Sequence, residues 1–149
     1  MKSTTTESAP TAVQSNQTLP FESIKILVVE DCPDNRYLYK RWLERRGATV
    51  TLAEDGLEGS ELALKQNFDL VIMDIHMPVM DGLTAMQNLK QNLYDRPVIA
   101  LTGSAGLDER QSLLQSGFTT VLNKPVELDQ FFATIQATLE QHPKSATTQ

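Results

Sequence analysis

Several features that define common classes of protein are absent from this chain of 149 residues. It has a single cysteine, Cys32, so no disulfide can form within the chain. The two histidines, His76 and His142, lie far apart, and with one cysteine they offer no His- or Cys-based zinc site. No apolar run approaches the roughly 20 residues that cross a bilayer, and the N-terminal segment lacks the apolar core of a signal peptide. We therefore expect a cytoplasmic protein without a membrane partner.

Positive charge is also in short supply. The chain has 13 Lys and Arg residues against 19 Asp and Glu residues, which gives a formal net charge of −6. Proteins that clamp nucleic acid normally present a basic face, so this balance argues against a nucleic-acid partner. A chain of this length typically forms one domain and can bury roughly two thirds of its unfolded surface, which is enough for a core without disulfides.

Composition divides the chain into one domain and two tails. Residues 1–22 are rich in Ser, Thr, Gln and Pro and contain few large apolar groups, and residues 141–149 are similar. Such segments cannot bury enough surface to offset the entropy lost on ordering, so both are predicted to be flexible tails. The folded domain is predicted to span residues 23–140.

Between the tails, apolar runs alternate with helical patterns. Residues 24–29, 70–73 and 98–101 are nearly continuous apolar runs, typical of parallel strands that are buried on both faces. Residues 48–53 and 119–123 are more polar and suit the edges of a sheet. Apolar side chains at helical spacing and local end signals predict helices over residues 35–46, 57–66, 83–92, 107–116 and 127–140.

Strand–helix units that alternate in this way predict an α/β fold. Right-handed crossovers place helices on both faces of the sheet, which gives a three-layer sandwich. The flavodoxin-like (βα)5 arrangement has a parallel five-stranded sheet of strand order 2-1-3-4-5. We predict this order because it puts the two more polar strands at the edges.

Polar side chains stand where four of the predicted strands end. They are Glu30 and Asp31 after the first strand, Asp74 after the third, Thr102 after the fourth and Lys124 after the fifth. The carboxyl ends of such strands meet at one edge, where sites form. Three carboxylates at close range repel one another, and Mg²⁺ resolves the conflict because it prefers oxygen ligands. The set therefore predicts a magnesium site.

The same edge has the groups that phosphoryl transfer needs. Asp74, at the end of a central strand, can act as a nucleophile and form an acyl phosphate. Lys124 can contact the phosphoryl oxygens as a charge, and Thr102 as a hydroxyl donor. Each residue alone is more typical of a cap, a turn or a solvated surface, and structural ion pairs can imitate such clusters. Their joint placement favours the functional interpretation.

Four segments resemble the receiver domain of two-component response regulators. They are residues 28–31 (VVED), 73–82 (MDIHMPVMDG), 100–103 (ALTG) and 124–125 (KP). The longest segment is the most specific, and the resemblance covers about residues 24–140. It implies that Asp74 is a phosphoacceptor, which takes its phosphoryl group from phosphohistidine on a histidine kinase or a histidine-phosphotransfer protein.

The resemblance also implies roles for the neighbouring residues. The ligands of Mg²⁺ would be the carboxylates of Glu30, Asp31 and Asp74 and the backbone carbonyl of His76. Thr102 resembles the switch hydroxyl, and Lys124 resembles the family's lysine, joined to Pro125 by a cis bond. Such a domain assists only its own phosphorylation and dephosphorylation, so we do not expect an enzyme. No output domain is expected after the last helix, and the signal would pass to a downstream protein partner.

One position departs from the receiver pattern. The switch aromatic, usually Tyr or Phe three residues before the lysine, is Val121. This leaves open a degenerate receiver that acts as a binding module without phosphorylation, although the intact site residues argue against it. A phosphatase of the haloacid dehalogenase type would need a second Asp two residues after the nucleophile, where the chain has His76. The phosphate-binding loop GxxxxGK followed by Ser or Thr is absent.

The first predicted helix, residues 35–46, has a basic and aromatic band in an otherwise acidic chain. Its members are Arg36, Tyr37, Tyr39, Lys40, Arg41, Trp42, Arg45 and Arg46. One interpretation is an amphipathic helix with Leu38 and Leu43 inward and a solvated charged face. The other is a docking surface for the protein that bears the phosphohistidine, because exposed Tyr, Trp and Arg side chains anchor many interfaces.

Overall fold

Residues 19–103 and 106–143, the part of the chain described by this computed structural model, contain one sheet of five parallel strands. The strands are β2 (Lys25–Val29), β3 (Thr49–Ala53), β4 (Leu70–Asp74), β5 (Val98–Thr102) and β6 (Thr120–Asn123). Their order across the sheet is β3-β2-β4-β5-β6, and every neighbouring pair is parallel. This is the predicted order 2-1-3-4-5, with the two more polar strands at the edges.

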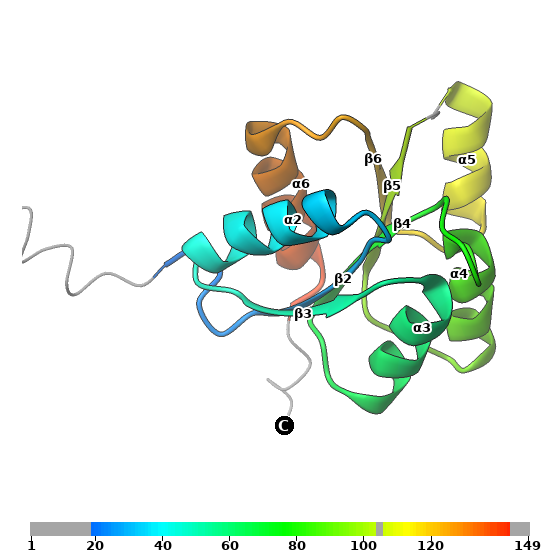
Figure 1. The fold of residues 1–149 in the computed structure, drawn as a ribbon, viewed down its shortest axis with the longest axis horizontal. Helices are drawn as coiled ribbons and strands as arrows, with labels where there is room; N and C mark the ends of the chain where they lie inside the picture. Colours follow the sequence, from blue (N-terminus) through cyan, green and yellow to red (C-terminus); the bar gives the residue numbers. More distant parts are fainter. Residues whose placement is uncertain (1–18, 104–105, 144–149) are drawn as a thin grey trace, which may run out of the picture.

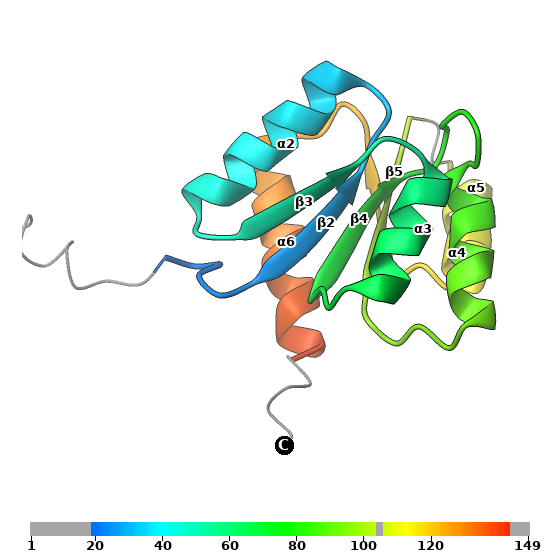
Figure 2. The same cartoon turned by 60° about the horizontal axis from the view of Figure 1, so that its bottom comes forward.

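Helices cover both faces of the sheet, as predicted for a three-layer sandwich (Figures 1 and 2). They are α2 (Pro33–Arg45), α3 (Gly56–Lys65), α4 (Gly82–Gln91), α5 (Leu107–Gln115) and α6 (Leu128–Gln141). One hydrophobic core lies under α3, α4 and α5, and a second lies under α2 and α6. Successive residues of β2 alternate between them: Leu27 and Val29 enter the first core, and Ile26 and Val28 the second.

The helices begin and end within two residues of their predicted bounds. The largest difference at a helix start is in α2, which begins at Pro33 rather than residue 35. Proline suits the first turn because its fixed φ is already helical and its missing N–H would have no partner there. At the other end, Gly47 adopts a φ of +98°, a left-handed conformation that lets the chain turn back into β3.

The packed part of the chain includes a residue from the predicted N-terminal tail. Phe21 is 2% exposed, its ring lies 6.0 Å from that of Phe132, and its N–H donates to the carbonyl of Arg46 at 2.7 Å. Residues 1–18 and 144–149 of the predicted tails lie outside the described residues, and Gln141 is the last residue of α6. Among the described residues, every helix is too short or too polar to cross a membrane.

Candidate functional site

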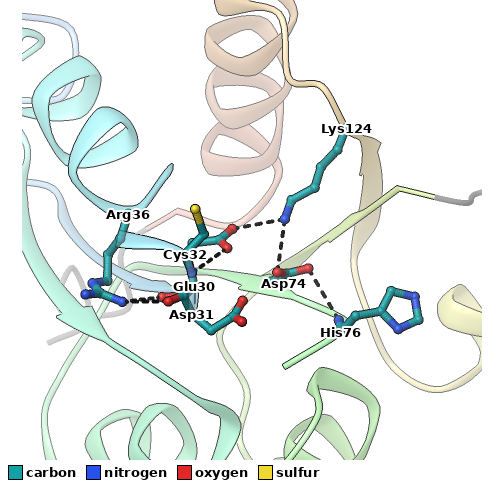
Figure 3. Close-up of polar contacts among 7 residues, drawn as sticks. All are labelled: Glu30, Asp31, Cys32, Arg36, Asp74, His76 and Lys124. Atoms are coloured by element: carbon teal, nitrogen blue, oxygen red, sulfur yellow. Dashed lines mark hydrogen bonds and ion pairs between the residues drawn. The ribbon is translucent and has the colours of Figure 1, made fainter. Parts of the chain in front are cut away.

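Three carboxylates meet at the carboxyl edge of the sheet (Figure 3). Glu30 and Asp31 directly follow β2, and Asp74 is the last residue of β4, the strand beside it. One oxygen of each carboxylate lies within 4.8 Å of the other two. Glu30 and Asp74 are buried, and Asp31 is half-buried. The structure thus brings together the acidic residues that the sequence analysis selected.

Lys124 completes this cluster from the segment after β6. Its Nζ lies 3.0 Å from Asp74 Oδ2 and 3.2 Å from Glu30 Oε1. Burial alone would lower the pKa of Lys124, but the hydrogen bond and charge of Asp74, together with the charge of Glu30, raise it above its ordinary value. The ammonium group is therefore charged at neutral pH. The peptide bond between Lys124 and Pro125 is cis, as the resemblance implies.

Glu30 is a buried carboxylate held by one hydrogen bond and one ion pair. Its Oε2 accepts from the N–H of Cys32 at 3.1 Å, whereas its Oε1 has the ion pair with Lys124 at 3.2 Å. Burial, and next the charge of Asp74, raise the pKa of Glu30. A divalent cation would neutralise the repulsion and give this oxygen a ligand role. The three clustered carboxylates, an all-oxygen donor set, therefore fit Mg²⁺.

The remaining predicted site residues lie around Asp74. The backbone N–H of His76 makes a long contact of 3.4 Å with Asp74 Oδ1, and the His76 side chain is exposed. Thr102 ends β5 and is fully buried. Its carbonyl accepts the N–H of Lys124 at 2.8 Å, so the backbone of β5 positions the lysine. The roles of the His76 carbonyl and the Thr102 hydroxyl stay predictions.

The band on α2 is not exposed as a whole. Arg36 and Tyr39 are buried beside Leu43, whereas Leu38 is 41% exposed. The spacing 36, 39, 43 places these three side chains on one helix face, and Leu38 lies off it. The expectation that Leu38 points inward was therefore wrong, and Arg36 and Tyr39 do not belong to an exposed band.

Arg36 was predicted to belong to the basic and aromatic band of the first helix, but it lies beside the carboxylate site. Its guanidinium Nη1 donates to the carbonyl of Glu30 at 2.9 Å and to that of Asp31 at 3.3 Å (Figure 3). A charged residue on a surface helix is normally exposed, so residue type alone gave no reason to place it inside. Its spacing of three from Tyr39 and seven from Leu43 was the available signal.

Comparison with known proteins identifies this arrangement. A sequence model described as the response regulator receiver domain matches residues 26–136. The chain belongs to this family. It is 36% identical over 124 residues to the sensor histidine kinase RcsC of Escherichia coli (strain K12), covering 83% of this chain and 13% of that protein. It is 34% identical over 119 residues to the response regulator MprA of Mycobacterium ulcerans (strain Agy99), covering 80% and 51% respectively.

Solved receiver structures share the fold. The receiver domain of the Francisella response regulator 1452 aligns with a TM-score of 0.76 and 27% identity, over 79% of this chain and 98% of that one. The chemotaxis response regulator CheY4 of Vibrio cholerae aligns with a TM-score of 0.74 and 30% identity, over 78% and 98%. The chain spans only 13% of RcsC and 14% of the sensor protein GacS of Pseudomonas syringae pv. syringae, a further relative.

The predictions of family and fold are confirmed. The receiver domain is a module of two-component signal transduction, and it has the flavodoxin-like order of strands. The family match gives no support to the phosphatase and nucleotide-binding alternatives.

Proposed function

We propose that the receiver accepts a phosphoryl group on Asp74, in a reaction that requires Mg²⁺, and passes the signal on by protein contact. The observation that supports this most is the surroundings of the Asp74 carboxylate. This carboxylate is buried at the carboxyl edge of the sheet and accepts a hydrogen bond from Lys124. One of its oxygens lies within 4.8 Å of a carboxylate oxygen of Glu30 and of Asp31. The phosphodonor is phosphohistidine on a histidine kinase or a histidine-phosphotransfer protein.

In the transfer step, a carboxylate oxygen of Asp74 attacks the phosphorus atom of the donor. A new O–P bond forms and the N–P bond to the imidazole breaks, with its electron pair remaining on the imidazole nitrogen. The product on the receiver is an acyl phosphate. Such a transfer needs positioning and charge neutralisation above all, because the transferred group spreads negative charge over its equatorial oxygens.

The other site residues supply that neutralisation. Lys124, already 3.0 Å from Asp74, brings a fixed positive charge to the phosphoryl oxygens, and Thr102 brings a hydroxyl donor. Carboxylates of Glu30, Asp31 and Asp74, with the backbone carbonyl of His76, would hold Mg²⁺. A bound Mg²⁺ ion supplies further positive charge to the phosphoryl oxygens.

The face of α2 next to the site suits docking of the phosphodonor. A groove runs between α2 and the segment after β6, lined by Leu38, Trp42 and Val126 among others, and it reaches Lys124. Tyr37 and Arg41 are exposed on the same helix. An apolar groove with basic and aromatic side chains near it fits a protein partner. The receiver then acts as a phosphoacceptor rather than an enzyme, and its cytoplasmic location stays a prediction.

The degenerate receiver is the competing proposal, and Val121 is the feature that favours it. Val121 is buried in the core under α3, α4 and α5. Valine has no aromatic ring, so it cannot take the part of the switch aromatic. The complete set of carboxylates, Thr102 and Lys124 favours phosphorylation instead. The two proposals differ in whether Asp74 forms a phosphoryl adduct.

Intact mass spectrometry after incubation with acetyl phosphate and Mg²⁺ tests the proposal. We expect one phosphoryl adduct, lost with a chelator and in Asp74→Asn. Asp95→Asn, at an exposed loop position, serves as a matched control and should form the adduct normally. An unmodified wild-type protein would favour the degenerate receiver, and an adduct that persists in Asp74→Asn would place the acceptor elsewhere.

A further inference from the structure

We infer that Arg36 is a positioning residue, whose buried guanidinium fixes the backbone of Glu30 and Asp31 so that their carboxylates hold a divalent cation. The inference rests on the proposed function, because it concerns the same magnesium site. It adds a residue of α2 to a site that otherwise comes from the ends of β2 and β4 and the segment after β6.

One guanidinium nitrogen of Arg36 donates hydrogen bonds to two successive backbone carbonyls. Arg36 Nη1 donates to the Glu30 carbonyl at 2.9 Å and to the Asp31 carbonyl at 3.3 Å. The main chain of the same residue closes the turn, since the N–H of Arg36 donates to the carbonyl of Cys32 at 2.9 Å. Side chain and backbone of Arg36 therefore both hold the segment between β2 and α2, and that segment carries two of the three carboxylates.

The burial of Arg36 indicates that these carbonyls are its main partners. Only 7% of the residue is exposed, and a buried charge needs hydrogen bonds that replace water. Glu54 Oε2 is 3.8 Å from Arg36 Nη2, but the Glu54 side chain is 72% exposed, so the ion pair is weak. The guanidinium also lies 5.5 Å from the ring centre of Tyr37, which is an exposed side chain.

Positioning and simple electrostatics predict opposite effects of removing Arg36. Its positive charge repels a cation bound nearby, so loss of the charge alone would tighten Mg²⁺ binding. Loss of the hydrogen bonds to the two carbonyls would instead let the carboxylates of Glu30 and Asp31 move, which would weaken Mg²⁺ binding. Residues that orient metal ligands typically change metal affinity 10- to 100-fold when they are substituted. Lysine keeps the charge, but its ammonium nitrogen is one bond nearer the backbone than Arg36 Nη1 and is not held in a rigid plane, so it cannot contact both carbonyls in the same geometry.

The test measures the Mg²⁺ dissociation constant of the full chain by calorimetry, for wild type, Arg36→Gln and Arg36→Lys. We expect both variants to bind Mg²⁺ about 10-fold more weakly, although only one of them loses the charge. Lys65→Gln removes one positive charge from an exposed position in the last turn of α3, and Glu54→Gln removes the ion pair together with one exposed negative charge. Both controls should bind within twofold of wild type.

Urea unfolding with a chelator accompanies each titration, so that affinity is compared only among folded proteins. If Arg36→Gln does not fold, Arg36→Lys decides. Affinity in a folded Arg36 variant that equals or exceeds that of wild type overturns the inference while leaving the proposed function intact. If wild type itself neither binds Mg²⁺ nor forms the Asp74 adduct, the proposed function fails, and the inference fails with it.

Discussion

Gly59 of α3 and Val29 of β2 are so close that a Cβ atom on Gly59 would lie 2.6 Å from Val29 Cγ2. Real Cβ atoms do not approach other carbon atoms this closely, so the contact requires glycine. Val29 is the residue before Glu30. The close packing of α3 on Val29 therefore helps to fix the end of β2, which Glu30 and Asp31 follow.

Gly59→Ala should destabilise the domain by about 1–3 kcal/mol, because the added methyl overpacks against Val29. This is opposite to the helix-propensity effect, which favours alanine over glycine by roughly 1 kcal/mol. Urea unfolding measures the difference. In Val29→Ala/Gly59→Ala, the losses should be less than additive, because the smaller strand residue leaves room for the methyl. An unchanged or higher stability for Gly59→Ala would refute the close contact.

Glu30→Gln should stabilise the metal-free protein at pH 7 by about 1 kcal/mol, at the expense of Mg²⁺ binding. Burial and the charge of Asp74 raise the pKa of Glu30 above its ordinary value of 4.5. A raised folded-state pKa contributes stability that is complete below pH 4.5 and is lost as the pH rises through the folded value. Glutamine has no such loss, and Lys124 keeps its bond to Asp74.

Unfolding midpoints in a chelator, measured from pH 4.5 to 7.5, test this prediction. The stability of wild type relative to Glu30→Gln should decline across that range. Glu61→Gln, at an exposed position of α3, should follow wild type. If Glu30→Gln is the less stable protein at pH 7, attraction between Glu30 and Lys124 outweighs the cost of burying the carboxylate.

Val79 is a strained residue in the loop that follows Asp74. Its φ is +69°, a conformation that β-branched residues rarely adopt, and its side chain is 78% exposed. Val79→Asn should raise the free energy of unfolding by about 1 kcal/mol, since asparagine tolerates this backbone and little apolar burial is lost. Val79→Ala removes the β-branch but lacks the polar side chain that lets asparagine adopt a positive φ, so it should gain less. Equal stabilities in thermal unfolding would show that the loop stores no such strain.

The fold was predictable because burial and sequence pattern agree. β4 and β5 are buried along their whole lengths, and their sequences are nearly continuous apolar runs. Once the strand order was set, Glu30, Asp74 and Lys124 had to meet, because the carboxyl ends of parallel strands share one edge. This part of the site follows from topology, without any knowledge of side-chain conformations.

Two sets of contacts could not be predicted from local patterns. Arg36 is inside because carbonyls of the turn after β2 satisfy its charge, and those partners form only when the strand and α2 are assembled. Phe21 is a lone aromatic residue in a polar segment, and its partner Phe132 lies far away in the sequence. The carbonyls that Arg36 contacts and the Phe132 ring that Phe21 contacts do not belong to the same periodic pattern as Arg36 or Phe21.

The most direct test of the account is to locate the phosphorylated residue. The protein would be treated with acetyl phosphate and Mg²⁺, reduced with borohydride to convert an acyl phosphate to a stable alcohol, and mapped by peptide mass spectrometry. We predict homoserine at position 74, formed only when Mg²⁺ is present during phosphorylation. Reduction at another acidic residue, or none at all in protein shown to be folded, would contradict the claim that Asp74 is the phosphoacceptor.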